Sequence, residues 1–248
     1  MSYGRRKNSE NVAQWLEQVK AGFQRLLISN AVPITVQSTG QRGVGLKRLQ
    51  NQAQILETPQ LGVEDRIVEV CRRGWTVWDC GPSLGKSSVL FSRCVGPDGL
   101  VVSFSPSRED FLQAHSNAAI NESNNIMYLY VSIAGRSAER QFLDSLISER
   151  KLTLSEAAQD EDIPKPNLIR LYAQGANPKA LLEAESLIKY LRPHLIVDLE
   201  SSESHAALCK FAESSSYVLR SLTSGRRICL VEEIAGPVLC VPEEKVTF

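Results

Sequence analysis

The chain has 248 residues, of which 43% are hydrophobic, and its 28 Lys and Arg residues balance its 28 Asp and Glu residues. This length accommodates one α/β domain with an extension, and the zero net charge argues against a protein that binds nucleic acid or a membrane surface through its overall electrostatic field. No apolar run approaches the roughly 20 residues of a membrane span and no signal-peptide pattern opens the chain, so we expect a soluble intracellular protein.

Residues 1–62 are predicted to form a helical N-terminal extension. Apolar residues recur there at spacings of three and four, the pattern of an amphipathic helix: Val12, Trp15, Leu16, Val19, Phe23, Leu26 and Leu27. A turn-rich stretch over 30–45 follows, and residues 46–57 return to helical spacing. Residues 1–60 carry a charge of +5, from eight basic and three acidic residues. The apolar stripe either packs on the chain's own domain or docks a protein partner.

Residues 63–248 alternate between helix and strand patterns and are predicted to form one α/β domain. Helices are expected at 63–73, 85–95, 107–123 and 177–191, strands at 75–80, 100–105, 126–134 and 194–200, and a solvated connection at 136–151. Strands separated by helices of this length make a doubly wound, mostly parallel sheet. A ligand of such a sheet binds at the carboxyl ends of the strands, where the strand order reverses.

The glycine-rich stretch DCGPSLGKSS, residues 79–88, follows the first strand and fits three kinds of site. Gly81-Pro82-Ser83-Leu84-Gly85 spells the nucleophile elbow of a hydrolase, but the elbow comes early in the chain, and its partners Asp198 and His205 lie only seven residues apart. Gly85-Lys86-Ser87 is the tail of a phosphate-binding P-loop, but its first glycine would fall on Cys80, and Pro82 removes one of the amides that the loop needs.

The third interpretation is the D-x-G-x-x-x-G turn of a nucleoside-cofactor site. Gly81 and Gly85 would let the backbone approach the cofactor, and Asp79 would either accept a hydrogen bond from an ammonium or hold the loop. The second strand pattern starts at Gly99, 20 residues after Asp79, which is the βαβ repeat expected for such a site. These observations favour the nucleoside site over the other two.

Residues ~65–245 resemble the FkbM-like family of S-adenosylmethionine-dependent methyltransferases. The resemblance runs through VWDCGPSLGKSSVLFSRCVGPDGLVVSFSPS, where the family has a V-D-x-G-x-N-x-G turn, a G-P-x-G turn and an F-E-P strand end. It continues through LTLSEAAQDEDIPKPNLIRLYAQGAN, where the family has T-L-D and then K-I-D-V-E-G-A-E. The resemblance implies a Rossmann-like methyltransferase fold, S-adenosylmethionine as cofactor, and cofactor contacts at Asp79, Gly81, Ser83, Gly85 and Ser105.

The sequence departs from the family at acidic positions. The acid that would bind the ribose hydroxyls falls on Ser105, and later family acids fall on Tyr172, Gln174 and Asn177. A serine hydroxyl can still bind a ribose, without the charge-assisted part of that contact. Ser105→Glu is therefore expected to tighten cofactor binding about ten-fold, provided that the loop can adopt its bound shape.

Two classes of function follow from this comparison. In the first, the chain is a methyltransferase that acts on a hydroxyl of a small molecule or sugar, with Asp198, Tyr172 and Glu200 as candidate catalytic residues. In the second, the methyltransferase fold is catalytically degenerate and serves as a structural or interaction subunit, docking through the N-terminal stripe. In the first class, Asp79→Ala is expected to abolish methyl transfer while leaving the protein folded.

No metal site is expected. His115 falls within a predicted helix and His194 just before a strand, and neither has a second ligand at metal-binding spacing. The six cysteines show no C-x-x-C pair, and in an intracellular chain they are expected to be reduced and mostly buried.

Overall fold

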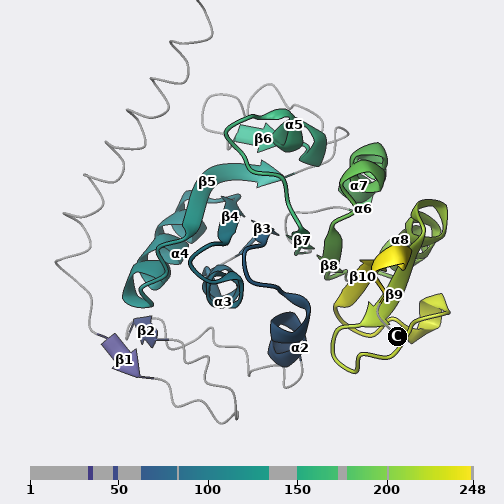
Figure 1. Ribbon diagram of the computed structural model, residues 1–248, viewed down its shortest axis with the longest axis horizontal. Helices are drawn as coiled ribbons and strands as arrows, with labels where there is room; N and C mark the ends of the chain where they lie inside the picture. Colours follow the sequence, from purple (N-terminus) through teal and green to yellow (C-terminus); the bar gives the residue numbers. More distant parts are fainter. Residues whose placement is uncertain are drawn as a thin grey trace, which may run out of the picture.

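The computed structural model describes residues 33–35, 47–49, 63–82, 84–133, 150–172, 178–199 and 201–246. Its main feature is an eight-stranded sheet with the strand order β6-β5-β4-β3-β7-β8-β10-β9 (Figure 1). The strands are β3 (Thr76–Cys80), β4 (Leu100–Ser105), β5 (Ile126–Ile133), β6 (Arg150–Leu152), β7 (Leu168–Leu171), β8 (His194–Val197), β9 (Tyr217–Ser221) and β10 (Val238–Pro242).

Neighbouring strands run parallel from β6 through β8, and β10 runs antiparallel to both β8 and β9. This confirms the predicted doubly wound, mostly parallel sheet. Asp79 and Ser105 lie on the adjacent strands β3 and β4, as predicted, because Asp79 pairs with Ser103 and Cys80 with Phe104. The carboxyl ends of β3 and β4 therefore meet at one edge of the sheet.

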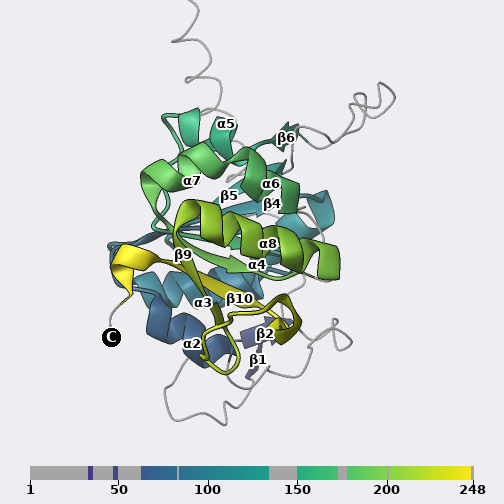
Figure 2. The same cartoon turned by 90° about the vertical axis from the view of Figure 1, so that its right-hand side faces the viewer.

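Helices cover both faces of the sheet. They are α2 (Val63–Val70), α3 (Lys86–Val95), α4 (Arg108–Ile120), α5 (Leu154–Gln159), α6 (Pro178–Glu183), α7 (Glu185–Leu191) and α8 (Ser202–Ser215), with short 3₁₀ turns η2 (Val231–Glu233) and η3 (Glu243–Lys245). In Figures 1 and 2, α2, α3 and α4 lie on one side of the sheet, and α6, α7 and α8 on the other. Among the described residues, no helix has both the length and the apolar character needed to cross a bilayer.

Alternation along each strand divides the hydrophobic core into two layers. Val77 of β3 packs with Ile67 of α2 and Phe91 of α3, whereas its neighbour Trp78 packs in the layer that contains Phe211 of α8. Successive strand residues point to opposite faces, so a sheet covered on both faces buries every position of its central strands. This accounts for the burial of four successive residues, 77–80, in the central strand β3.

The sequence patterns fail in three places. Lys47–Leu49 form strand β2, paired antiparallel with β1 (Pro33–Thr35), so the helical spacing predicted over 46–57 is wrong there because backbone pairing prevails. The helix expected over 177–191 bends at Ala184, whose N–H is shared between the carbonyls of Ala180 and Leu181. Arg150–Leu152 form the edge strand β6, part of which was expected to be a connection. The N-terminal stripe with Trp15 and Phe23 lies outside the described residues.

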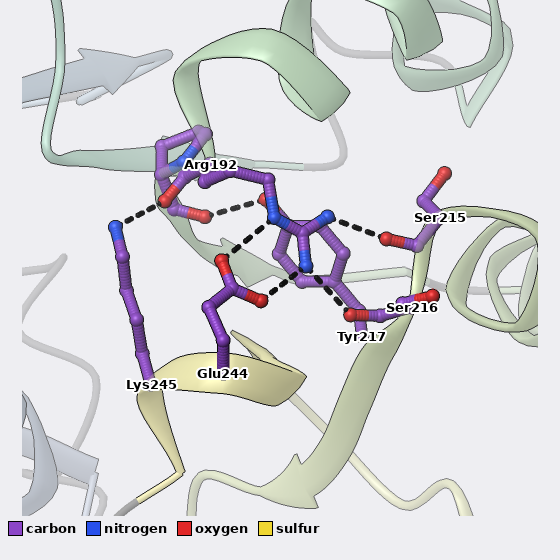
Figure 3. Close-up of polar contacts among 7 residues, drawn as sticks. Arg192, Ser215, Ser216, Tyr217, Glu244 and Lys245 are labelled. Carbon is purple, nitrogen blue, oxygen red and sulfur yellow. Dashed lines mark hydrogen bonds and ion pairs between the residues drawn. The ribbon is translucent and has the colours of Figure 1, made fainter.

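Arg192 joins α7 to the end of the described chain (Figure 3). It caps α7 in the left-handed conformation, with a φ of 51°. Its guanidinium donates to both carboxylate oxygens of Glu244, at 2.8 and 2.6 Å, and to the carbonyls of Ser215 and Ser216, and it lies 4.7 Å from the centre of the Tyr217 ring. The hydrogen bonds and charge of Arg192 lower the pKa of Glu244 to about 2. One side chain thereby fixes the antiparallel end of the sheet.

Replacing Arg192 by Lys should lower the free energy of unfolding by about 2 kcal/mol, because an ammonium cannot donate hydrogen bonds to both oxygens of a carboxylate and to two carbonyls at once. Urea denaturation followed by circular dichroism measures the change. Lys189→Arg, at an exposed ion pair with Glu185 on α7, is the matched control and should change stability by less than about 0.5 kcal/mol. Equal free energies of unfolding for Arg192→Lys and the unmodified chain would contradict this role of the Arg192 guanidinium.

Candidate functional site

The strand order reverses between β3 and β7. From β3 the chain continues to β4, β5 and β6 on one side, and later passes to β7 and β8 on the other. The two strands that flank this point are parallel and in register, so that Asp79 of β3 pairs with Arg170 of β7. A doubly wound sheet opens a crevice at the carboxyl ends of such a strand pair. The turn over residues 81–85 begins at this place.

Asp79 is the polar centre of the candidate site. Its side chain has no exposed surface, and its Oδ2 accepts hydrogen bonds from the hydroxyls of Ser87 and Ser88, both at 2.7 Å. Its Oδ1 accepts from Nη1 of Arg170 at 2.9 Å. One carboxylate thus ties the first turn of α3 and strand β7 to β3. An ammonium could reach this carboxylate only by displacing one of these partners, so the geometry corresponds to the loop-holding role of Asp79.

The two glycines of the turn are required for different reasons. Both have left-handed backbones, with φ of 80° at Gly81 and 81° at Gly85. A Cβ on Gly85 would lie 2.6 Å from Cα of Ala114, so this glycine allows α3 and α4 to pack closely. A Cβ on Gly81 would lie 3.6 Å from Cβ of Tyr172, an ordinary contact, so Gly81 is required mainly for its conformation. The N–H of Gly81 donates to the carbonyl of Phe104 on β4.

Ser105 ends β4 beside this turn. Its side chain is fully buried, and its hydroxyl has no hydrogen-bond partner among the described residues. A small cavity of about 10 Å³ lies at the same edge of the sheet, lined by Cys80, Gly81, Phe104, Pro106, Ser132 and Ile133, and Ser105 is not part of this lining. A buried hydroxyl without a partner costs about 1–3 kcal/mol of desolvation, which makes Ser105 a polar group in need of a ligand or a water.

Tyr172 and Asp198 follow the neighbouring strands β7 and β8. The N–H of Tyr172 donates to the carbonyl of Cys80, and that of Asp198 to the carbonyl of Leu171. The guanidinium of Arg170 lies 5.1 Å from the centre of the Tyr172 ring. The structure therefore brings Asp79, Ser105, Tyr172 and Asp198 to the same edge of the sheet. The remaining predicted site residues, Ser83 and Glu200, lie outside the described residues, as do 173–177.

Three residues that hold this site, Arg170, Ser87 and Ser88, were not predicted as site residues. Arg170 gives a signal in the sequence, because a charged residue between Ile169 and Leu171 in a buried strand needs a partner of opposite charge. Ser87 was considered only as part of a P-loop tail. Lys86, the residue that a P-loop would aim at phosphate, pairs instead with Glu64 of α2 at 2.6 Å.

The charge of Asp79 acts on its surroundings. Burial, and then the negative charge of Asp79, raise the pKa of the Cys80 thiol well above its ordinary value, and Arg170 opposes this only in part. The same two causes raise the pKa of Tyr128 on β5. Cys80 is therefore a protonated thiol that lines the cavity, without the thiolate character of a nucleophile.

The other cysteines and histidines that the structure describes lie away from this edge or have structural contacts. Of the six free cysteines, Cys71, Cys80 and Cys240 are buried, Cys94 and Cys209 half-buried, and Cys229 exposed. Within the described ranges, no three His, Cys, Asp or Glu side chains gather as a metal site would require. His205, the histidine of the elbow interpretation, has its Nε2 3.1 Å from the carbonyl of Leu199.

No protein-family model and no curated protein matches the chain by sequence. Among solved structures, the FkbM methyltransferase of Methylobacillus flagellatus is 17% identical with a TM-score of 0.49, and the match covers 71% of this chain and 50% of that one. A SAM-dependent O-methyltransferase of Thermotoga maritima is 11% identical, with coverage of 77% and 67% and a TM-score of 0.48. A SAM-dependent methyltransferase of Aquifex aeolicus is 13% identical, with coverage of 75% and 94% and a TM-score of 0.44. Similarity of this degree does not place the chain in one of their families.

Proposed function

We propose that the chain is an S-adenosylmethionine-dependent methyltransferase whose cofactor lies over the turn 81–85 and beside Ser105. The observation that carries this proposal is the buried hydroxyl of Ser105, without a partner among the described residues, beside the crevice where the strand order reverses. A hydroxyl in this position can both donate to and accept from a ribose. The proposed acceptor is a hydroxyl of a small molecule or sugar.

Each candidate residue has a role in this proposal. Asp79 holds the turn through Ser87 and Ser88, and Arg170 holds Asp79. When bound, S-adenosylmethionine supplies an electrophilic methyl group. Asp198 is the proposed base for the acceptor hydroxyl, with Tyr172 and Glu200 as further candidates for positioning the acceptor, which supplies most of the acceleration in such a transfer.

The same edge also favours a second candidate function, a catalytically degenerate fold that serves as an interaction subunit. The cavity lined by Cys80, Gly81 and Phe104 at this edge measures about 10 Å³, far less than an adenosyl group fills. The carboxylate of Asp79 already accepts three hydrogen bonds from protein donors. Such a subunit would use the apolar stripe around Trp15 and Phe23 to dock a protein partner.

Calorimetric titration with S-adenosylmethionine and S-adenosylhomocysteine separates the two functions. A methyltransferase should bind both ligands with a dissociation constant below about 1 mM, a free energy of about −4 kcal/mol. The absence of binding at that concentration, with an intact circular dichroism spectrum, favours the interaction subunit.

Ser105→Ala gives a test at the level of one atom. It should weaken cofactor binding by about five-fold, because one neutral hydrogen bond is lost, while the free protein stays as stable as before or gains stability. Ser103→Ala is the matched control on the same strand, because Ser103 is equally buried but its hydroxyl oxygen lies 3.3 Å from that of Ser88, within hydrogen-bonding distance. The control should lower stability and leave cofactor affinity unchanged. Ser105→Ala with unchanged affinity would contradict the proposed ribose position. Ser105→Glu is a poorer test, because Ser105 is fully buried and the longer, charged side chain would have to displace its neighbours.

Asp79→Asn tests the loop-holding role. The change leaves Arg170, with 18% of its side chain exposed, without its anion, and should lower the free energy of unfolding by about 3 kcal/mol in urea denaturation. Asp79→Ala is accordingly expected to destabilise the fold, contrary to the expectation from the sequence. In a double-mutant cycle with Arg170→Met, the two losses should be smaller together than their sum. Additive losses would show that the pair does not act as one unit.

A further inference from the structure

A second hollow, of about 280 Å³, lies on the face of the sheet that α2 and α3 cover. Leu239 and Val241 of β10 form part of its lining, and both belong to the core layer of that face. Residues of α2, of the turn after β9 and of η3 also line it. Its volume is slightly below that of pockets that hold drug-sized ligands, so it suits a compact one. It is independent of the proposed methyltransferase site.

Two guanidinium groups meet at one end of this hollow. Arg66 of α2 reaches the turn after β9, where a Cβ built on Gly225 would lie 2.9 Å from its Cζ. Arg220 of β9 donates to the carbonyl of the same Gly225 at 3.4 Å. Glu69 pairs with Arg66 at 2.7 Å and is the one carboxylate in the lining. Both guanidinium groups therefore lie beside the same turn, and an anion bound there would be attracted by both.

Arg72 and Lys245 lie at the other end, near His194. The ammonium of Lys245 donates to a neutral carbonyl, that of Arg192, at 2.6 Å, which holds it in place and leaves its charge uncompensated by that contact (Figure 3). Burial and the charges of Lys245 and Arg72 lower the pKa of His194 to about 4, while the nearby Glu244 opposes this only weakly. The imidazole is therefore neutral at physiological pH. Its buried Nδ1 has no hydrogen-bond partner among the described residues.

Among the described residues, the lining holds four basic side chains and one carboxylate, an excess of three positive charges in a chain whose net charge is zero. We propose that this hollow binds a small phosphate-bearing molecule. Phosphate oxygens accept from several donors at once, and guanidinium groups match them with paired N–H bonds. The cations line a single hollow that also has apolar walls, whereas a nucleic-acid surface presents them as a patch or a long stripe. These features favour a small molecule over a polynucleotide.

Calorimetry on the full chain tests this proposal with pyrophosphate, and with adenosine diphosphate to distinguish an inorganic from a nucleotide ligand. We expect saturable binding with a dissociation constant below about 1 mM. The double variant Arg72→Gln/Lys245→Gln should weaken it at least about ten-fold, because charge-assisted contacts are lost. Glutamine at 245 can still donate to the Arg192 carbonyl, and Arg72 is exposed, so the fold should persist. Lys151→Gln/Lys210→Gln removes two exposed charges from β6 and α8 and should leave the affinity unchanged.

The titration of His194 in the unmodified chain, followed by NMR, is a second readout that needs no variant. A bound anion offsets the charges of Arg72 and Lys245, so pyrophosphate should raise the pKa of His194 above its value in the free protein. The pKa of His115, which lies on α4, should not change. No saturable binding of either phosphate compound, equal weakening in the two double variants, or binding of an oligonucleotide alone would each overturn the proposal.

Discussion

The buried carboxylate of Asp79 is the interaction on which the candidate site depends. It lies on the central strand, between the two halves of the sheet, and its partners come from the first turn of α3 and from β7. A buried carboxylate without a countercharge is expensive, so the presence of Arg170 opposite Asp79 decides whether β3 and β7 can pair in this register. The same ion pair fixes the conformation of the turn that begins at Gly81.

The carboxyl edge of the sheet and the hollow beside α2 differ in charge and in volume. At the carboxyl edge, polar groups are neutral or already paired, and the described residues leave little volume. The hollow beside α2 has a volume of about 280 Å³, and its described lining residues include more basic side chains than carboxylates. Asp79 and Asp198 are acids at the carboxyl edge, whereas basic side chains predominate among the described residues that line the hollow. The chain thus combines a fold suited to a nucleoside cofactor with a separate basic hollow.

The sequence predicted the alternation of elements well, because strands buried on both faces are mostly apolar, as residues 100–104 are apart from Ser103, and because Gly85 and Gly96 delimit the helix between β3 and β4. It predicted the adjacency of Asp79 and Ser105 from the βαβ spacing alone. It could not predict that the Asp79 carboxylate accepts hydrogen bonds from Ser87, Ser88 and Arg170. Arg170 lies 91 residues from Asp79 in the chain, and only the register of β3 with β7 brings these two side chains together. Short elements such as β2 and β6 depend on long-range pairing, which local spacing does not record.

The separation between Asp79 and Arg170 also bears on how the chain folds. Strands β3 and β7 are neighbours in the sheet, but β4, β5 and β6 lie between them in the sequence, so the central pairing forms only after a long segment has been made. Until then β3 presents an open edge that could pair with another chain. An inward-pointing charge is one of the devices that discourage such pairing. Asp79 therefore protects the growing sheet from intermolecular association until the arrival of Arg170 neutralises it and lets the two halves join.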